Sequence, residues 1–429
     1  MHIIITAVIL AFTMNDMTPP VRESAQPHSR RNSSKTWVIA PVLIIIIGVL
    51  VAGYFAFAKT RTSQPGPAPE SAVTTPEPAK PVVTHLTTPK PVRALYMSSW
   101  IASGRTNRDK LIKMVDETEA NALVIDIKDA TGKISFLVDD PYLQNLGSAE
   151  NRIRDIVPLI QELHDKGIYV IGRVAVFQDP YMTEKHPDWA IKKLSDGTVW
   201  KDRKGLSFLD PANQNVWGYA VAIGKAAYAI GFDEINFDYI RYPSDGNIKD
   251  IDYKLEEGKK RADNIEAFWA YLHDHMKSEA NIPISADLFG LVTTATDDLG
   301  IGQVLERALP HFDYIGPMVY PSHYASGYQN IAKPATKPYE VVLSSMQGAK
   351  KKIDAMLADP NVSPDIKARI SFNQIRPWLQ DFDLGATYTA DMVKLQMKAV
   401  YDSGLDSWMM WDPANTYTVG AYAPAGAVQ

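Results

Sequence analysis

From residue 92 onward, short apolar segments alternate with longer segments in which apolar residues recur at helical spacing. The short segments have the composition of buried strands. We expect eight strands, which cover residues 92–99, 122–129, 167–177, 232–243, 282–290, 312–321, 368–378 and 404–413. The amphipathic segments predicted to be helices include residues 151–166, 216–230, 263–280 and 389–403.

Glycine marks the point where several predicted helices give way to the next strand. Gly167, Gly231 and Gly404 each follow a helical segment, which is the usual signal of a helix C-terminus. Eight successive strand–helix units predict an α/β fold, the closed (β/α)8 TIM barrel, over residues 92–417. Neither the Gly-rich dinucleotide motif nor a P-loop is present, so we expect no nucleotide as a partner.

Residues 37–57 form an uncharged apolar run that is long enough, as a helix, to cross the ~30 Å hydrocarbon core of a bilayer. Trp37 and Tyr54 lie near its ends, where aromatic side chains prefer the membrane interface. The alternative is a buried core helix, but uncharged runs of this length are rare in soluble domains. No small-residue cleavage site follows, so we predict an uncleaved signal-anchor that contacts the lipid bilayer.

Basic residues favour one orientation of this predicted transmembrane helix. They flank it unequally, with four before it and two after it: Arg22, Arg30, Arg31, Lys35, Lys59 and Arg61. By the positive-inside rule, the tail of residues 1–36 is expected in the cytoplasm and the barrel outside it. The sequence thus predicts a single-pass protein of the cell membrane.

Two further segments complete the predicted domain organisation. Residues 58–91 are rich in Pro and Thr and nearly free of large apolar side chains, so they are predicted to form a disordered linker. Residues 418–429 follow the last strand–helix unit and are expected to be a C-terminal tail. A stalk of this kind suits a substrate in the cell envelope.

Composition excludes several classes of chemistry. The chain has no cysteine, which rules out disulfides, thiolate metal sites and cysteine nucleophiles. Its net charge of −5 gives no reason to expect nucleic acid as a partner. A metal-dependent hydrolase or deacetylase needs clustered His and carboxylate ligands. The first strand carries no His-x-His, and His273 and His275 diverge around a predicted helix. We therefore expect no metal and no cofactor.

Polar side chains gather at the ends of the predicted strands, where barrel enzymes keep their active sites. Because strand side chains alternate, Asn236 and Asp238 share one face of the fourth strand, and we expect both to point into the barrel mouth. Asp287 lies near the end of the fifth strand. Further side chains expected at the mouth, as contacts to substrate, are Asp126, Lys128, Arg173, Arg241, Tyr320, His323, Gln374, Arg376, Trp378, Trp411 and Asp412.

Asp238 and Asp287 suggest a specific chemistry. Glycoside hydrolysis uses two carboxyl groups across the scissile bond, one that donates a proton and one that attacks the anomeric carbon or activates water. The Trp and Tyr residues at the strand ends suit stacking on the C–H faces of sugar rings. The alternative is structural, because an Asp at a strand end often caps the next helix or pairs with an Arg.

The sequence resembles a bacterial and archaeal "putative glycosyl hydrolase" domain family, whose fold is a TIM barrel. The matching segments, in order, are NALVIDIKDATGKISF, GIYVIGRVAVFQDP, GFDEINFDYIRYPSDG, SADLFG, IGQ at residues 301–303, GPMVYPSHY and IRPWLQDF. Together they cover nearly all of residues 92–417. The resemblance implies a hydrolase that acts on O-glycosyl bonds of an envelope or extracellular polysaccharide or oligosaccharide.

That family is distantly similar to barrels of the α-amylase type, in which an Asp closing the fourth strand is the nucleophile and the acid closes the fifth strand. The similarity implies that Asp238 is the nucleophile and Asp287 the acid. Two features depart from the pattern. The acid there is usually Glu, and the expected seventh strand carries no inward carboxylate, since Asp381 and Asp383 lie in the following loop. The alternative function is a non-catalytic, membrane-anchored carbohydrate-binding barrel.

Overall fold

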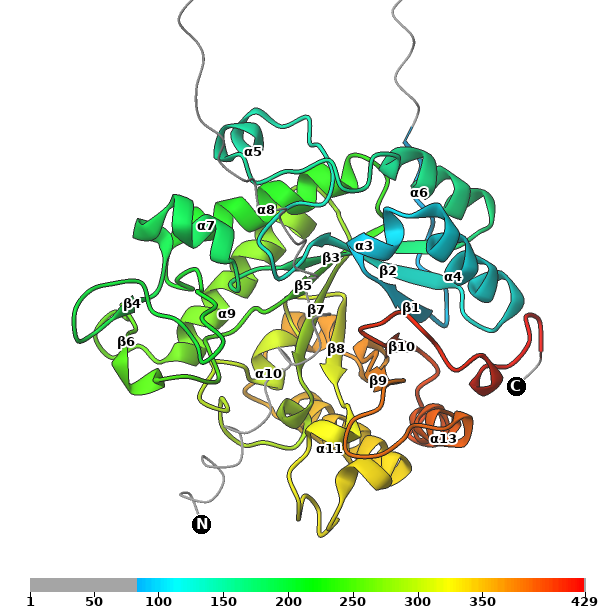
Figure 1. Cartoon of the computed structure of the whole chain (residues 1–429). Helices are drawn as coiled ribbons and strands as arrows, with labels where there is room; N and C mark the ends of the chain where they lie inside the picture. Colours follow the sequence, from blue (N-terminus) through cyan, green and yellow to red (C-terminus); the bar gives the residue numbers. More distant parts are fainter. Residues whose placement is uncertain (1–82, 428–429) are drawn as a thin grey trace, which may run out of the picture. The chain divides into compact units, whose positions relative to one another are not determined.

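Eight parallel strands close into a barrel in the computed structural model, which describes residues 83–427 (Figure 1). The strands, in their order around the barrel, are β1 (Arg93–Met97), β2 (Ala122–Lys128), β3 (Tyr169–Ala175), β5 (Glu234–Asp238), β7 (Ile284–Phe289), β8 (Tyr314–Met318), β9 (Trp378–Gln380) and β10 (Trp408–Trp411). The predicted (β/α)8 barrel is confirmed. A short antiparallel sheet outside it pairs β4 (Lys192–Lys193) with β6 (Ile251–Asp252).

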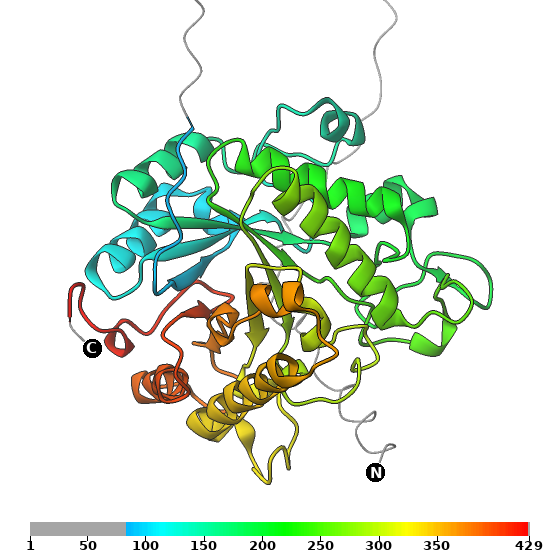
Figure 2. The same cartoon turned by 180° about the vertical axis from the view of Figure 1, so that it is seen from behind.

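Helices surround the strands in both views (Figure 1 and Figure 2). The helices are α3 (Ser99–Ala102), α4 (Arg105–Glu117), α5 (Pro141–Leu146), α6 (Ile156–Asp165), α7 (Pro180–Lys185), α8 (Gln214–Tyr228), α9 (Arg261–Leu272), α10 (Leu305–Ala308), α11 (Pro338–Ala358), α12 (Pro364–Arg369) and α13 (Ala390–Asp402). A π-helical turn, His273–Ser278, continues α9. The four helices predicted from periodicity correspond to α6, α8, α9 and α13.

Alternation along each strand builds two apolar cores. On β2, Leu123 and Ile125 belong to the large core between barrel and helices, whereas Ala122 and Val124 belong to a smaller cluster inside the barrel. Every residue of β2 is buried, as expected for a parallel strand covered on both faces. Polar side chains that point inward are therefore held in a nearly dry interior.

The seventh strand begins later than expected. Residues 368–378 were predicted to be a strand, but β9 begins only at Trp378. Ser363 caps helix α12 by accepting a hydrogen bond from the Ile366 backbone N–H, and Pro364 occupies the first turn. Ser371 then caps a short 3-10 turn, Phe372–Gln374. Local capping therefore outweighs the apolar composition of this segment.

A β-bulge interrupts β2 just before its end. Asp126 pairs with Arg173, but Lys128 pairs with Val174, so Ile127 is the extra residue. Strict alternation would place Lys128 on the same face as Asp126, but the bulge places it on a different one. Its Nζ lies 2.9 Å from Asp179 Oδ2 and 5.9 Å from the centre of the Tyr219 ring on α8. The bulge turns Lys128 away from the barrel interior.

Residues 83–91, which we assigned to the linker, lie against the N-terminal ends of the strands. The Leu86 backbone N–H donates to Asp233 Oδ1 at 2.7 Å, and Asp233 directly precedes β5. Thr88 Oγ1 lies 2.9 Å from the hydroxyl of Tyr169, the first residue of β3. The chain thus enters the barrel at the face opposite the mouth.

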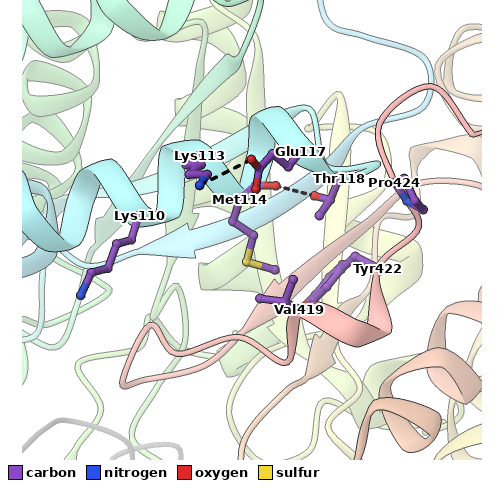
Figure 3. Close-up of a pocket in the computed structure, with 8 residues that line it drawn as sticks. All are labelled: Lys110, Lys113, Met114, Glu117, Thr118, Val419, Tyr422 and Pro424. Atoms are coloured by element: carbon purple, nitrogen blue, oxygen red, sulfur yellow. Dashed lines mark hydrogen bonds and ion pairs between the residues drawn. The ribbon is translucent and has the colours of Figure 1, made fainter.

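The segment after β10 also packs on the barrel. Residues 418–427, which we assigned to the tail, run past α4, where the Ala425 N–H donates to the Glu117 carbonyl at 3.0 Å. A pocket of about 390 Å³ lies between α4 and this segment, lined by Met114, Val419 and Tyr422 among others (Figure 3). Its lining includes none of the carboxylates expected at the barrel mouth.

The predicted transmembrane helix, residues 37–57, lies outside the described residues. Among residues 83–427, no helix combines the length and the apolar character needed to cross a bilayer.

Candidate active site

Arg173 connects two carboxylates at the centre of the barrel. Its Nη1 lies 2.7 Å from Asp126 Oδ1 on β2, and its Nη2 lies 2.5 Å from Asp238 Oδ2 at the end of β5. Its Nε donates to the same Asp238 oxygen at 3.1 Å. All three side chains are buried. Because β3 lies between β2 and β5, the strand order itself brings this cation between the two anions.

The backbone directly after Asp238 has an unusual conformation. Tyr239 has a φ of 54°, in the left-handed region that non-glycine residues rarely adopt. Its N–H donates to Asp238 Oδ1 at 2.5 Å. Both oxygens of Asp238 are thus held, one by Arg173 and one by the backbone. Strained conformations of this kind are frequent at functional sites, where they fix a side chain.

Asp287 lies on β7, the strand next to β5, and is 1% exposed. Its Oδ1 accepts hydrogen bonds from Trp378 Nε1 at 2.7 Å and from Asn236 Nδ2 at 3.0 Å. Burial, together with the negative charge of Asp238, raises the pKa of Asp287 to about 8. Asp287 therefore keeps its proton to a higher pH than an ordinary carboxyl group.

Asp238 and Asp287 face the same guanidinium. Arg173 Nε is 3.1 Å from Asp238 Oδ2 and 4.0 Å from Asp287 Oδ2. The distance between the two carboxylate oxygens therefore cannot exceed the sum of these two distances. That bound admits both the ~5 Å separation of retaining glycosidases and the lower part of the ~6.5–9.5 Å range of inverting enzymes. The site therefore holds an ion-paired carboxylate beside a carboxyl group with a raised pKa.

Asp126 acts as a support for Arg173. Its second oxygen accepts a hydrogen bond from the Tyr96 hydroxyl at 2.6 Å, so both oxygens are occupied. Burial raises the pKa of Asp126. It also raises the pKa of Tyr96 well above the ordinary value of a tyrosine. Tyr96 also stacks on Trp411 at a centroid distance of 3.9 Å, and Arg173 lies 5.1 Å from the Trp411 ring.

Three buried polar atoms around the carboxylates have no hydrogen-bond partner within residues 83–427. They are Tyr320 Oη, Trp411 Nε1 and Asn236 Oδ1. Burial raises the pKa of Tyr320, as do the nearby charges of Asp287 and Asp238. Such unpaired groups are rare because each costs about 1–3 kcal/mol. Two donors and one acceptor are thus available here to hydroxyl groups of a ligand.

Other residues predicted for the mouth have structural partners of their own. Arg241 packs over the Phe289 ring at 4.6 Å and donates to the Tyr242 carbonyl at 3.1 Å. Burial lowers the pKa of Arg241. His323 lies edge-on to Tyr320, with ring centroids 5.4 Å apart, and its Nδ1 is 3.0 Å from Ser322 Oγ.

Asp412 organises the loop that follows β10. It accepts hydrogen bonds from the backbone N–H groups of Ala414 at 3.1 Å and Thr416 at 2.6 Å. Burial raises the pKa of Asp412 to about 6. These contacts are those of a turn-forming residue rather than of a group aimed at substrate.

Gln374 and Arg376 lie at the opposite end of the barrel from Asp238, because β9 starts after them. Arg376 Nη2 is 2.5 Å from Glu234 Oε1 at the start of β5, and its guanidinium stacks 3.7 Å from the Tyr314 ring. Gln374 Nε2 donates to the Phe312 carbonyl at 2.9 Å. The structure therefore does not place these two residues, or Lys128, beside the carboxylate pair.

Tyr96 is a site residue that the sequence analysis missed. It points into the barrel with Ala94, one residue before the end of β1. The same alternation that selected Asn236 and Asp238 would have selected this hydroxyl. Within the part of the chain that the structure describes, no three His, Asp or Glu side chains are grouped so as to hold a metal ion.

The fold and the carboxylates together define a barrel with a buried, unequal carboxyl pair on neighbouring strands. Residues 94–417 match the family described as "putative glycosyl hydrolase domain", and the chain belongs to this family. No curated protein matches the sequence.

Several solved structures resemble the chain. A hypothetical protein from Ruminiclostridium thermocellum is 31% identical over 48% of this chain and 98% of its own, with a TM-score of 0.41. The PgaB (BpsB) glycoside hydrolase domain from Bordetella bronchiseptica is 11% identical over 75% of this chain and 94% of its own, with a TM-score of 0.55. The spore cortex-lytic enzyme SleL from Bacillus megaterium is 8% identical over 80% and 74%, with a TM-score of 0.45. The likeness to the PgaB domain shows a shared fold.

Proposed function

We propose that this protein hydrolyses glycosidic bonds and that Asp238 and Asp287 are its catalytic carboxyl pair. The observation that carries this proposal is their unequal state. Asp238 is ion-paired with Arg173, whereas Asp287 on the next strand accepts hydrogen bonds from the neutral donors Asn236 and Trp378 and has a raised pKa. A proton donor beside an anionic carboxylate is the pair that glycoside hydrolysis requires.

In this mechanism Asp287 gives its proton to the glycosidic oxygen as the bond from that oxygen to the anomeric carbon breaks. Asp238 either forms a bond to the anomeric carbon or takes a proton from the water that does so. In the first case water later hydrolyses the glycosyl–Asp238 bond and returns a proton to Asp287. Asn236 and Trp378 hold Asp287 in place through their hydrogen bonds to its Oδ1.

The unpaired polar atoms supply the binding part of this proposal. Tyr320 Oη, Trp411 Nε1 and Asn236 Oδ1 would exchange hydrogen bonds with sugar hydroxyls beside the scissile bond. The stacked rings of Tyr96 and Trp411 offer an apolar surface next to them. Sugars combine hydroxyl edges with apolar C–H faces, so this mixture of groups suits them.

The test uses Asp238→Asn, with the exposed Asp391→Asn as a matched control. The proteins are incubated with a panel of polysaccharides and nitrophenyl glycosides, and released reducing ends and nitrophenol are measured. We expect Asp238→Asn to lose about 10³-fold or more in kcat, because it removes a group that acts on the reacting carbon. Asp391→Asn should retain full activity. Hydrolysis that survives in Asp238→Asn would exclude the assigned role.

The second candidate is a barrel that binds carbohydrate without cleaving it. It is favoured by the burial of the pair, since Asp238 is 4% exposed and both its oxygens already accept hydrogen bonds. The same panel separates the two functions. A glycan that binds but is not cleaved by the wild-type chain would favour the binding function.

We further propose that the barrel acts outside the cytoplasm on an envelope or extracellular polysaccharide. The support is the uncharged run of residues 37–57, which is long enough to anchor the chain in a membrane. After cell fractionation the full-length chain should be in the membrane fraction, and its barrel should be digested by protease added outside spheroplasts. Recovery in the soluble fraction would contradict this location.

A further inference from the structure

Trp100 differs from the other tryptophans of the described chain. Its side chain is 57% exposed, whereas the seven others within residues 83–427 are at most 8% exposed. Tryptophan is enriched at binding interfaces because its ring combines a large apolar surface with a polar N–H group. Trp100 is the second residue of α3, which follows the C-terminal end of β1 at the mouth of the barrel (Figure 1). It therefore lies on the face where the carboxylate pair is found.

One face of the Trp100 ring is covered by a fixed cation. The Arg152 guanidinium lies 4.0 Å from the centre of the ring, and the Arg152 side chain is only 4% exposed. Two carboxylates hold this guanidinium, Glu150 at 2.7 Å and Asp129 in a shorter contact. An aromatic ring supported in this way loses little freedom when a ligand packs on its other face.

Asp129 links Arg152 both to α3 and to the active site. Its Oδ2 accepts a hydrogen bond from Ser99 Oγ at 3.2 Å, directly before Trp100. Its charge also contributes to the raised pKa of Asp126, the partner of Arg173. The ring and the carboxylates thus share one network of charged side chains at the ends of β1, β2 and β3.

We propose that Trp100 is a sugar-stacking platform that binds a pyranose unit of the substrate away from the bond that is cleaved. The C–H face of a pyranose is flat and apolar and matches the exposed face of the indole. The inference rests on the proposed glycosidase function and deepens it, because a platform on the rim serves a chain of several sugar units. A single terminal sugar held beside Asp238 and Asp287 has no use for it.

The test compares Trp100→Ala and Trp100→Phe in the full-length chain, purified in detergent. Val419→Ala is the control, because Val419 is also an exposed apolar residue, at 61%, but lies in the segment that packs past α4. Binding is measured by depletion of the protein on insoluble chitin, cellulose, mannan and peptidoglycan. Catalysis is measured separately on nitrophenyl monoglycosides, which carry a single sugar unit.

We expect Trp100→Ala to weaken polymer binding by roughly tenfold or more and to leave monoglycoside hydrolysis unchanged. Trp100→Phe should retain most of the binding, and Val419→Ala all of it. Polymer binding by Trp100→Ala equal to wild type would overturn the inference, and so would an equal loss on polymer and monoglycoside. In either case, a loss of activity in Asp238→Asn would still support the proposed function. A wild-type chain that neither binds nor cleaves any glycan would overturn both.

Discussion

At the scale of single residues, the positions of Asp238 and Asp287 follow from strand alternation, but their charge states do not. Alternation predicted the face of each side chain, and its position along the segment predicted that it lies near a strand end. The raised pKa of Asp287 depends on its burial and on the proximity of Asp238, which lies on another strand. Sequence spacing carries no information on burial between strands that are far apart in the chain.

The pH dependence of activity should follow the proton on Asp287. In the proposed mechanism Asp287 is the acid, and because its pKa is about 8, kcat/KM should fall as the pH rises through about 8. Initial rates on a substrate found in the panel, measured across this interval, check the prediction. A rate that keeps rising above that pH would be incompatible with a protonated Asp287.

Asp287 should also make the fold less stable as the pH rises. Its pKa in the folded state, about 8, is above its ordinary value of 3.8, so the folded state keeps a proton that the unfolded state releases between these values. The free energy of unfolding therefore falls as the pH rises through this interval. Urea denaturation at several pH values should show a smaller fall for Asp287→Asn than for wild type. Equal slopes would mean that Asp287 has an ordinary pKa.

At the scale of elements, periodicity located seven of the eight barrel strands, whereas β9 begins only at the last residue of the segment predicted for it. Local hydrogen bonding explains this difference. The apolar residues of 368–378 suggested a strand, yet Ser363 and Ser371 cap helical turns there. Gln374 and Arg376 were therefore expected at the wrong end of the barrel. The bulge at Ile127 has no signal in the alternation of β2, because it is set by the pairing with β3.

The bulge places Lys128 in a buried ion pair with Asp179, and this pair should be structural. Lys128→Met leaves the carboxylate of Asp179 buried without its cation, which should lower the free energy of unfolding by about 3–5 kcal/mol. The double variant Lys128→Met/Asp179→Asn should recover part of the loss, since no unpaired charge remains and Asn can still cap α7. Chemical denaturation checks both. A larger loss in the double variant would contradict this account.

At the scale of the whole molecule, the sequence predicted the barrel but not how its two ends are secured. Residues 83–91 and 418–427 have few large apolar residues, so their composition favoured a linker and a tail. Their contacts include hydrogen bonds to partners distant in the sequence, such as Asp233 and Glu117. Such contacts depend on the completed fold, and local patterns do not reveal them.

Deleting residues 83–91 should therefore cost stability. A chain that begins at residue 92 loses the Leu86 contact to Asp233 and the Thr88 contact to Tyr169, both with buried partners. We expect a free energy of unfolding lower by about 1–3 kcal/mol than that of a chain that begins at residue 83. Denaturation of the two truncated proteins in urea measures the difference. Equal midpoints and slopes would show that the segment does not secure the barrel.

The chain enters the barrel beside Asp233 and Tyr169, at the end opposite Asp238 and Asp287. The contacts of this entering segment are at the starts of β3 and β5, whereas Asp238 and Asp287 lie toward the C-terminal ends of their strands. Residues 83–91 therefore do not occupy the mouth, and they do not compete with a long polymer for space there.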